Sequence, residues 1–373
     1  MHQTDISLRS GFRLDKLITL VFENVLSGRK SPEKVYFVEL GVDAEVMNYI
    51  GKNYLEREWT SISQSEAWGA SSREDLIDQG IDFFYRLGYD FIPLGPDWKD
   101  LPEFKKRKAK DTAELSRGER EWIEEGGGII KNWDDFEEIG WGDIEYEMEH
   151  IRRTAEKLPK GMKITVGSTL FEMILENFLG YEDLFKFSVK KPDLVEAIFQ
   201  KWGQKLLEFY KEAIKMPEVG AIFHADDLGY KGETLLSHDF LRENVFPWFK
   251  KFTSLAHENG KTYWYHCCGN VLSIMEDLIE DVDIDAFHSF QDVIISVGEF
   301  MEKYGDRIAC LGGIDVDKLS RTNSKDLRKY VKNTLDECMP GRYALGSGNT
   351  VTNYVPPENY LTMLEEGMEW NNE

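Results

Sequence analysis

Short runs of β-branched, aromatic and other apolar residues recur along the whole chain. Runs of this length that end at glycine, proline or acidic residues are typical of buried strands. We predict eight strands, at residues 35–40, 91–94, 164–167, 221–224, 262–268, 286–290, 308–313 and 343–347.

Helical periodicity fills most of the intervals between these strands. The clearest helices are predicted at residues 194–213, 240–256, 272–279 and 327–338. Residues 1–32 read as a helical lead-in, with apolar residues at helical spacing at Leu14, Leu17, Ile18, Val21 and Phe22. Eight strands that alternate with helices predict an α/β fold, the parallel (β/α)₈ or TIM barrel. In this fold, catalytic groups lie at the C-terminal ends of the strands.

The interval between the second and third predicted strands is unusually long. Residues 98–160 contain a basic run at 105–110, three glycines at 126–128 and an acidic, tryptophan-rich stretch up to Trp141. We interpret this interval either as a solvated insertion or as a lid or partner-docking element over the barrel mouth. The sequence shows no internal repeat and no interdomain linker, so we predict a single barrel domain over residues 1–373.

The charge balance narrows the class of partners. Of the 373 residues, 42% are hydrophobic, and the formal net charge is -23 with a pI of about 4.8. Such acidity argues against nucleic acid or an anionic membrane as a partner. The first ten residues lack the apolar run of a signal peptide, and four cysteines do not form a disulfide framework. We therefore expect a soluble, cytoplasmic protein, and the sequence leaves open whether it forms a homodimer.

Polar residues suited to catalysis follow most of the predicted strands, so a barrel would gather them at one mouth. Each carboxylate among them could instead cap the helix that follows it. Capping is a weaker explanation for Asp226 and Asp227, because one of two neighbours must face the interior. The candidates are Asp97, Glu172, His224, Asp226, Asp227, His266, Cys268, His288, Gln291, Asp315, Ser347 and Asn349.

The segment at residues 261–270 combines an aromatic strand with an unusual polar end. Side chains alternate along a strand, so His266 and Cys268 should point to one face and Cys267 to the other. An imidazole and a thiol side by side can chelate a cation such as Zn²⁺. The alternative is a buried histidine beside two small buried thiols.

Long ordered runs occur at residues 90–97, ending in Asp97, then at 224–230, 240–247, 265–270, 304–307 with 312–315, and 356–364. Together they resemble the uroporphyrinogen decarboxylase superfamily, over roughly residues 80–366. The resemblance implies a (β/α)₈ barrel, in agreement with the strand count.

The superfamily has two main activities, and the sequence matches them unequally. The decarboxylases bind a tetrapyrrole rich in carboxylates and carry an N-terminal arginine-rich motif, since arginines engage carboxylates in pairs of hydrogen bonds. Here Asp97 matches the family's aspartate, but Arg9, Arg13, Arg29 and Arg57 do not form that motif. Decarboxylation of uroporphyrinogen is therefore not expected.

The other branch comprises methyltransferases that work with corrinoid proteins and bind zinc through a His-x-Cys pair and a later cysteine. His266 and Cys268 match the pair, but Ser347 stands where the later cysteine would be. A hydroxyl is a poor zinc ligand and catalytic zinc normally keeps three protein ligands, so a third must come from elsewhere. Glu172 is the first candidate and Asp227 the second. Cys310 and Cys338, at a strand start and on a helix, are less suitable.

The resemblance thus implies a zinc-assisted methyltransferase that moves a methyl group between a small O-, N- or S-methyl compound and a corrinoid protein. Its catalytic residues would be Asp97, Asp227 and His266, and its zinc ligands His266, Cys268 and Glu172. Two alternatives stay open, a metal-free lyase acting on a carboxylated substrate and a non-catalytic protein that binds a corrinoid or tetrapyrrole. The residues expected to contact substrate are His224, His288, Gln291, Asp315, Ser347 and Asn349.

Overall fold

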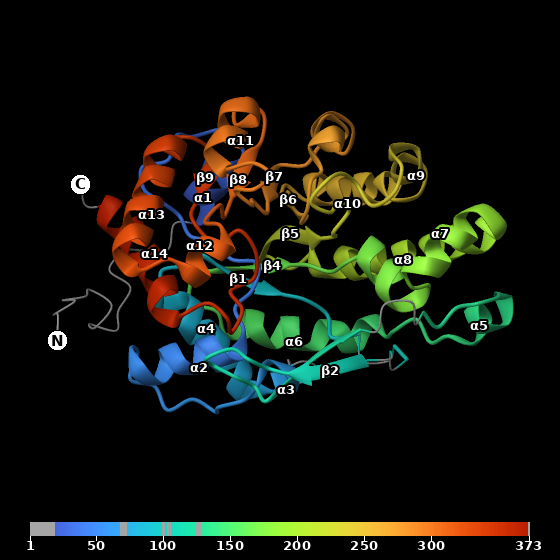
Figure 1. Cartoon of the computed structure of the whole chain (residues 1–373), viewed down its shortest axis with the longest axis horizontal. Coiled ribbons are helices and arrows are strands. Elements are labelled where there is room, and N and C mark those ends of the chain that lie inside the picture. The colour runs from blue at the N-terminus through green and yellow to red at the C-terminus, as the bar shows by residue number, and fades with distance from the viewer. Residues whose placement is uncertain are drawn as a thin grey trace.

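Seven parallel strands form the central sheet, which curls around a core of aromatic and small side chains (Figure 1). The computed structural model describes residues 19–67, 73–98, 101, 102, 104, 106–123 and 128–371. In spatial order the strands are β1 (Phe91–Leu94), β4 (Lys163–Val166), β5 (Val219–Ala225), β6 (Thr262–His266), β7 (Ala286–His288), β8 (Ala309–Leu311) and β9 (Tyr343–Ala344). Chain order and spatial order agree, as the barrel prediction requires.

The first predicted strand, residues 35–40, takes the eighth place in the ring. The N–H of Val38 donates to the carbonyl oxygen of Leu345 at 2.9 Å, and the N–H of Leu345 donates to that of Tyr36 at 2.8 Å. The ring of Phe37 packs 5.9 Å from that of Tyr89, directly before β1. The segment therefore lies between β9 and β1, and the predicted (β/α)₈ barrel is confirmed.

Inward-pointing residues from alternate positions fill the barrel, and α1 (Thr19–Leu26) closes its lower end. Phe22 of α1 stacks on Tyr36 with ring centroids 4.5 Å apart and meets Phe91 edge-on at 5.6 Å. The described end of the lead-in, α1, is therefore part of the core, and Leu14, Leu17 and Ile18 lie outside the described residues. The interior cluster contains Phe22, Val25, Leu26, Tyr36, Val38, Phe91, Ala221, Phe223, Trp264, Ala286, Ala309, Leu311 and Ala344.

Amphipathic helices cover the outside of the barrel (Figure 1). Within the described residues, no helix combines the length and the apolar character needed to cross a membrane. The helices are α2 (Ala44–Asn53), α3 (Gln64–Ala67), α4 (Glu74–Arg86), α5 (Trp133–Glu138), α6 (Ile144–Lys157), η2 (Met173–Phe178), α7 (Tyr181–Lys190), α8 (Pro192–Ala213), α9 (His238–Asn244), α10 (Phe246–Glu258), η3 (Leu272–Ile274), η4 (Asp277–Asp281), α11 (Val297–Tyr304), α12 (Val316–Arg321), α13 (Ser324–Cys338) and α14 (Pro357–Trp370).

Two predicted helices differ from the structure. The helix expected at 240–256 is divided into α9 and α10 at Val245, because Pro247 has no N–H to continue the hydrogen-bond ladder of α9. The helix expected at 272–279 is a 3₁₀ turn, η3, followed by the π-helical turn η4. The predicted helices at 194–213 and 327–338 are confirmed by α8 and α13.

The long interval at 98–160 contains a β-hairpin, α5 and α6. The hairpin pairs β2 (Lys106–Lys110) with β3 (Glu119–Ile123) outside the ring of strands (Figure 1). Arg117 anchors it to the barrel mouth through an ion pair of 2.5 Å with Asp43, which follows the first strand segment. The last helix, α6, packs between α4 and α8 and so takes the position of a crossover helix.

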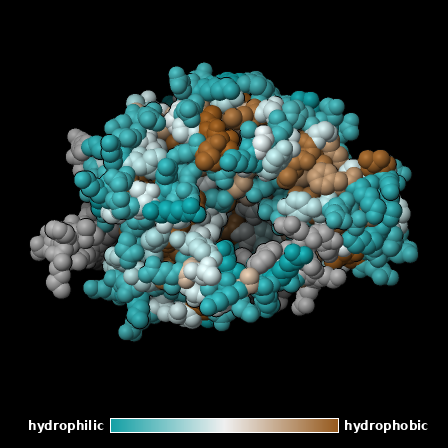
Figure 2. Space-filling view, viewed as in Figure 1, coloured by the Kyte–Doolittle hydropathy of each residue, from teal (hydrophilic) through white to brown (hydrophobic). Residues whose placement is uncertain are grey.

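Most of the surface in the view of Figure 2 is hydrophilic, with a few hydrophobic patches. This agrees with the net charge of -23. The basic strand β2 contributes less positive charge than its sequence suggests, because Lys106 and Lys108 both form ion pairs with Glu121 of β3.

Candidate active site

The ends of β5, β6 and β7 bring three inward-facing positions into one row. Ala225, His266 and His288 are register partners across these strands. Phe223 lies two residues before Ala225, on the same face of β5. Its ring is 5.5 Å from the ring of His288 and 5.6 Å from that of Trp264. These aromatic rings form a dry floor under the two histidines.

The loops that follow β5 and β6 are held tightly together. The N–H of Asn270 donates to the carbonyl oxygen of Tyr230 at 2.7 Å. Gly269 has a φ of 80°, and a Cβ atom there would lie only 2.3 Å from the backbone of Gly229. This close approach requires glycine, and it places the side chains of Asp227 and Cys268 next to each other.

Asp227, His266 and Cys268 form a group whose ligand atoms lie within 4.8 Å of one another. The Nε2 atom of His266 is 3.5 Å from the Sγ atom of Cys268 and 3.8 Å from Oδ1 of Asp227. The same Oδ1 accepts a hydrogen bond of 2.7 Å from the N–H of Cys268. A carboxylate oxygen, an imidazole nitrogen and a sulfur are ligands that zinc accepts, so the donor set fits this metal.

Burial determines the protonation of this group in the absence of a cation. It lowers the pKa of His266 to about 3, so the imidazole is neutral, as a metal ligand must be. Burial and the nearby charge of Asp227 raise the pKa of the Cys268 thiol to about 12. The amide of Asn349 donates to Sγ of Cys268 at 3.0 Å, which orients the sulfur and favours its charged form.

A second layer of buried residues supports the group. His288 is fully buried, with Nδ1 2.7 Å from Nδ1 of His266 and Nε2 3.1 Å from the carbonyl oxygen of Ser347. Asp226 is also fully buried, and its carboxylate accepts hydrogen bonds from the backbone N–H groups of residues 170–172. Of the two adjacent carboxylates, Asp226 therefore holds the backbone while Asp227 faces the barrel mouth.

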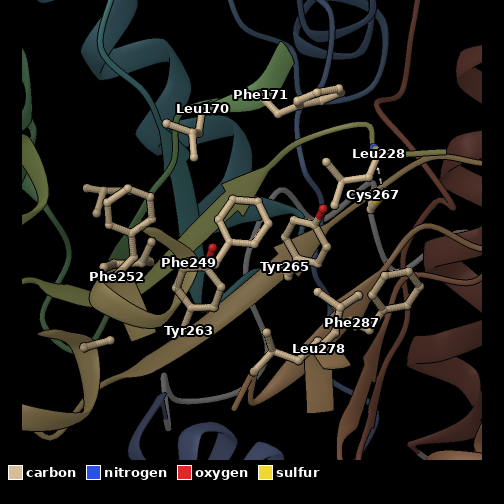
Figure 3. Packing of buried hydrophobic residues seen from close by; sticks show 14 of the residues in the cluster. Leu170, Phe171, Leu228, Phe249, Phe252, Tyr263, Tyr265, Cys267, Leu278 and Phe287 are labelled. Carbon is tan, nitrogen blue, oxygen red and sulfur yellow. Dashed lines mark hydrogen bonds between the residues drawn. The ribbon is translucent and has the colours of Figure 1, made fainter. Parts of the chain in front are cut away.

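The opposite face of β6 belongs to the hydrophobic core, as the predicted alternation requires. Cys267 is fully buried and accepts a hydrogen bond of 3.2 Å from the N–H of Leu228 (Figure 3). In Figure 3, Tyr263 and Tyr265 of β6 pack near Phe249 of α10 on the same side. Cys267 and Cys268 thus have different environments despite being neighbours in sequence.

Glu172 is not one of the three residues whose ligand atoms lie together, but its carboxyl group is near them. Burial, followed by the charges of Asp227, Glu176 and Asp226, raises the pKa of Glu172 well above its usual value. Its role as a zinc ligand stays a prediction. Three residues expected to contact substrate have no exposed surface and make their hydrogen bonds within the protein: His224, His288 and Ser347.

Three other residues expected to contact substrate lie together. Gln291, Asp315 and Asn349 line one cavity of about 650 Å³ beside the ends of β7, β8 and β9. Asp315 also caps α12 by accepting hydrogen bonds from the N–H groups of Asp317 and Lys318, as its capping alternative predicted. Asp97 lies apart from the metal group, with its N–H bonded to Oε2 of Glu147 at 2.7 Å.

Two buried residues that sequence reasoning missed border this region. Glu39 interrupts the apolar run at 35–40, and a lone carboxylate in a predicted strand was a signal that could have identified it. Its carboxyl group contacts Ser347 and Tyr89. His150 lies on α6 within the presumed insertion, where no sequence signal distinguished it from other helix residues.

Comparisons with known proteins were consistent with the barrel. A family model described as uroporphyrinogen decarboxylase (URO-D) matches residues 128–370. A solved methyltransferase from Methanosarcina mazei has a TM-score of 0.64 at 17% sequence identity, over 97% of this chain and 98% of that one. A B12-independent methionine synthase from Shewanella sp. W3-18-1 has a TM-score of 0.48 at 11% identity, over 83% and 89%. No curated protein sequence matches the chain.

Proposed function

Since the chain belongs to the uroporphyrinogen decarboxylase (URO-D) family, we propose that it is a zinc-assisted methyltransferase. It moves a methyl group between a small O-, N- or S-methyl compound and a corrinoid carried by a partner protein. The observation that carries this proposal is the group of Asp227, His266 and Cys268 at the barrel mouth. The fold shared with the Methanosarcina mazei methyltransferase supports it.

The residues present fit a zinc ion without the cysteine that Ser347 replaces. Asp227, His266 and Cys268 would hold it, giving the three protein ligands usual for catalytic zinc. When bound, zinc supplies a Lewis acid that favours the thiolate form of Cys268 and polarises an oxygen, nitrogen or sulfur atom of the substrate. Asn349 keeps the sulfur in place, and the floor of Phe223 and Trp264 excludes water from below.

The reaction in the demethylating direction breaks the bond between the methyl carbon and its heteroatom and forms a bond from that carbon to cobalt. The electron pair of the broken bond stays on the heteroatom, which takes up a proton. Cobalt(I) supplies the two electrons of the new bond and becomes cobalt(III). The barrel therefore needs to bind and polarise the methyl compound and to leave its mouth open to the corrinoid.

The corrinoid protein has no assigned docking surface on this chain. The basic strand β2 was the conspicuous sequence candidate, but Lys106 and Lys108 are paired with Glu121. The single charge of Glu121 offsets only part of the positive charge of this strand, which also carries Arg107 and Lys110.

The proposal is tested with the zinc-loaded full-length protein, cobalt(I) cobalamin as acceptor and a panel of methyl ethers, methylamines and methyl thioethers. The absorbance change from cobalt(I) to methylcobalt(III) is followed over time. We expect turnover with at least one donor, its loss in His266→Ala, and its retention in His257→Ala, a histidine paired with Asp285 away from the group. No spectral change with any donor would contradict methyl transfer, and equal rates in metal-free protein would contradict the role of zinc.

A further inference from the structure

The loops around the barrel mouth expose large apolar side chains to solvent. Tyr230 follows β5, Val293 follows β7 and Tyr354 follows β9, and these residues are 55%, 72% and 39% exposed. Loops that follow parallel strands meet at the C-terminal mouth of a barrel, where the metal group also lies. The other exposed large hydrophobic residues of the described chain belong to α5 and α7. Apolar side chains that border one opening are suited to contact another molecule.

Two of these residues are linked closely to the metal group. The carbonyl oxygen of Tyr230 accepts a hydrogen bond of 2.7 Å from the N–H of Asn270, between the two loops that hold the metal group. Val293 lines the same cavity as Asn349, whose amide donates to Sγ of Cys268 at 3.0 Å. A partner that covers these side chains would therefore cover the metal group as well.

The β2–β3 hairpin is fixed to the same rim of the barrel. Arg117, in its turn, has a side chain that is only 6% exposed. This side chain forms ion pairs with Asp43 and Glu45, which follow the first strand segment. Arg120 of β3 lies over the ring of Tyr354, with its guanidinium carbon 4.6 Å from the ring centroid. The hairpin and the apolar rim therefore form one continuous surface, which we call the rim surface.

The hairpin gives the rim surface a positive part on a chain whose net charge is -23. All five residues of β2 are exposed. Four of them are cationic: Lys106, Arg107, Lys108 and Lys110. The two carboxylates of β3, Glu119 and Glu121, offset only part of this charge, since β3 also carries Arg120. A local patch opposite in sign to the rest of the protein attracts an anionic surface and orients it.

We propose that the rim surface docks the carrier of the corrinoid, and that this carrier is a protein whose contact surface is acidic beside an apolar centre. The inference rests on the proposed function, since the corrinoid must reach the metal group through the mouth. Tyr230, Val293 and Tyr354 contact the apolar part, and β2 pairs with the acidic part. A nucleic acid could use the same cations, but the net charge of -23 repels a long polyanion and the apolar rim gives it no matching contact.

Three purified probes separate the possible occupants: a cobalamin-loaded carrier domain with an acidic surface, one with a basic surface, and a short DNA duplex. Surface plasmon resonance measures their binding to the zinc-loaded full-length protein at low and at physiological salt. We expect the acidic carrier to bind, with an association rate that falls roughly tenfold as salt rises. The basic carrier and the duplex should show no saturable binding.

The double variant Lys108→Gln/Lys110→Gln tests the role of β2. It should slow association of the acidic carrier roughly fivefold, because steering by charge is weakened. Exposed ion pairs contribute little to stability, so the hairpin should stay folded. Lys211→Gln/Lys215→Gln is the matched control. It removes two exposed lysines that precede β5, at the opposite end of the barrel, and should bind the carrier as the parent does.

A second pair of variants tests the apolar part. Val293→Asp places a negative charge within the rim and should weaken binding of the acidic carrier roughly tenfold, because the charge loses water at the contact and faces a surface of the same sign. Val189→Asp makes the same change at a residue of α7 that is 82% exposed, and should leave binding unchanged.

Several results would overturn the proposal. They are an association rate unaffected by the β2 variant, equal slowing in the two lysine variants, equal weakening in the two aspartate variants, tighter binding of the basic carrier or the duplex, and no binding of the acidic carrier. Self-association of the parent that the β2 variant abolishes would also overturn it, because the occupant would then be a second copy of the chain. Binding of the acidic carrier without methyl transfer would instead contradict only the proposed function.

Discussion

The Nδ1 atoms of His266 and His288 lie 2.7 Å apart, so one of them must carry the proton that joins them. A carbonyl oxygen only accepts, so the contact between Nε2 of His288 and Ser347 places a proton on that nitrogen. In neutral His288 the Nδ1 atom is then an acceptor, and Nδ1 of His266 is the donor. This leaves Nε2 of His266 unprotonated, facing Cys268 and Asp227.

Replacement of His288 should therefore weaken metal binding although His288 does not belong to the metal group. We expect His288→Phe to lower zinc affinity by roughly 10- to 100-fold, because the tautomer and orientation of His266 are no longer fixed. His288→Asn retains an acceptor oxygen and should recover part of the loss. Competition with a chelating dye measures both affinities. Zinc binding by the Phe and Asn variants as tight as that of the parent would contradict this role of His288.

The choice between Asp227 and Glu172 as third ligand gives a direct metal-content prediction. After dialysis against a weak chelator, the parent should keep about one zinc ion per chain and Asp227→Ala should lose most of it, because only two protein ligands remain. Glu172→Ala is the matched control, and it should keep the metal. Elemental analysis of the three proteins decides which carboxylate is the ligand. Loss of zinc from Glu172→Ala, with zinc retained in Asp227→Ala, would make Glu172 the ligand.

Much of the fold could be predicted because each buried barrel strand is visible in the sequence as a short apolar run. The run at 91–94 coincides with β1, and the run at 221–224 lies within β5. The run at 262–268 exceeded β6 because Cys267 and Cys268 continue the apolar pattern after the strand pairing ends at His266. Hydrophobic residues also occur at buried positions outside strands, and Cys267 is such a position.

The candidate site could be predicted only where its residues are close in sequence. His266 and Cys268 share a face of one strand end, so strand alternation was sufficient to pair them. For the third member the sequence offered Glu172 first and Asp227 second. It could not place Asp227 beside the pair, because the approach of Gly229 to Gly269 is a long-range contact that no local pattern encodes. His150 was missed for the same reason.

The closure of the barrel by α1 should contribute strongly to stability. Phe22 has no exposed surface and touches Tyr36 and Phe91 in the barrel interior. We expect Phe22→Ala to lower the free energy of unfolding by about 3–5 kcal/mol, the usual cost of removing a buried aromatic ring. Phe185→Ala, at a ring that is 43% exposed, should change it far less. Urea denaturation followed by circular dichroism tests both, and similar losses in the two variants would contradict this role of α1.

Glu39 is buried in direct contact with Ser347. The hydroxyl and the N–H of Ser347 both donate to its carboxyl group, and the hydroxyl of Tyr89 donates to it at 3.3 Å. These hydrogen bonds favour the charged carboxylate. Burial has the larger effect and raises the pKa of Glu39 to about 8, so the carboxyl group keeps a proton near neutral pH.

This protonation makes stability depend on pH in a defined direction. The pKa of Glu39 rises from 4.5 to about 8 on folding, so between these values the folded protein keeps a proton that the unfolded chain has released. Stability should then be greatest below about pH 4.5 as far as this group is concerned, and fall by on the order of a few kcal/mol up to pH 8. Glu39→Gln cannot ionise and should flatten the decline in melting temperature between pH 5 and pH 8. Glu276→Gln, at an exposed carboxylate paired with Arg307, should leave the slope unchanged. Calorimetric melting temperatures across this range test the effect, and a parent slope equal to that of Glu39→Gln would show that Glu39 is ionised in the folded protein.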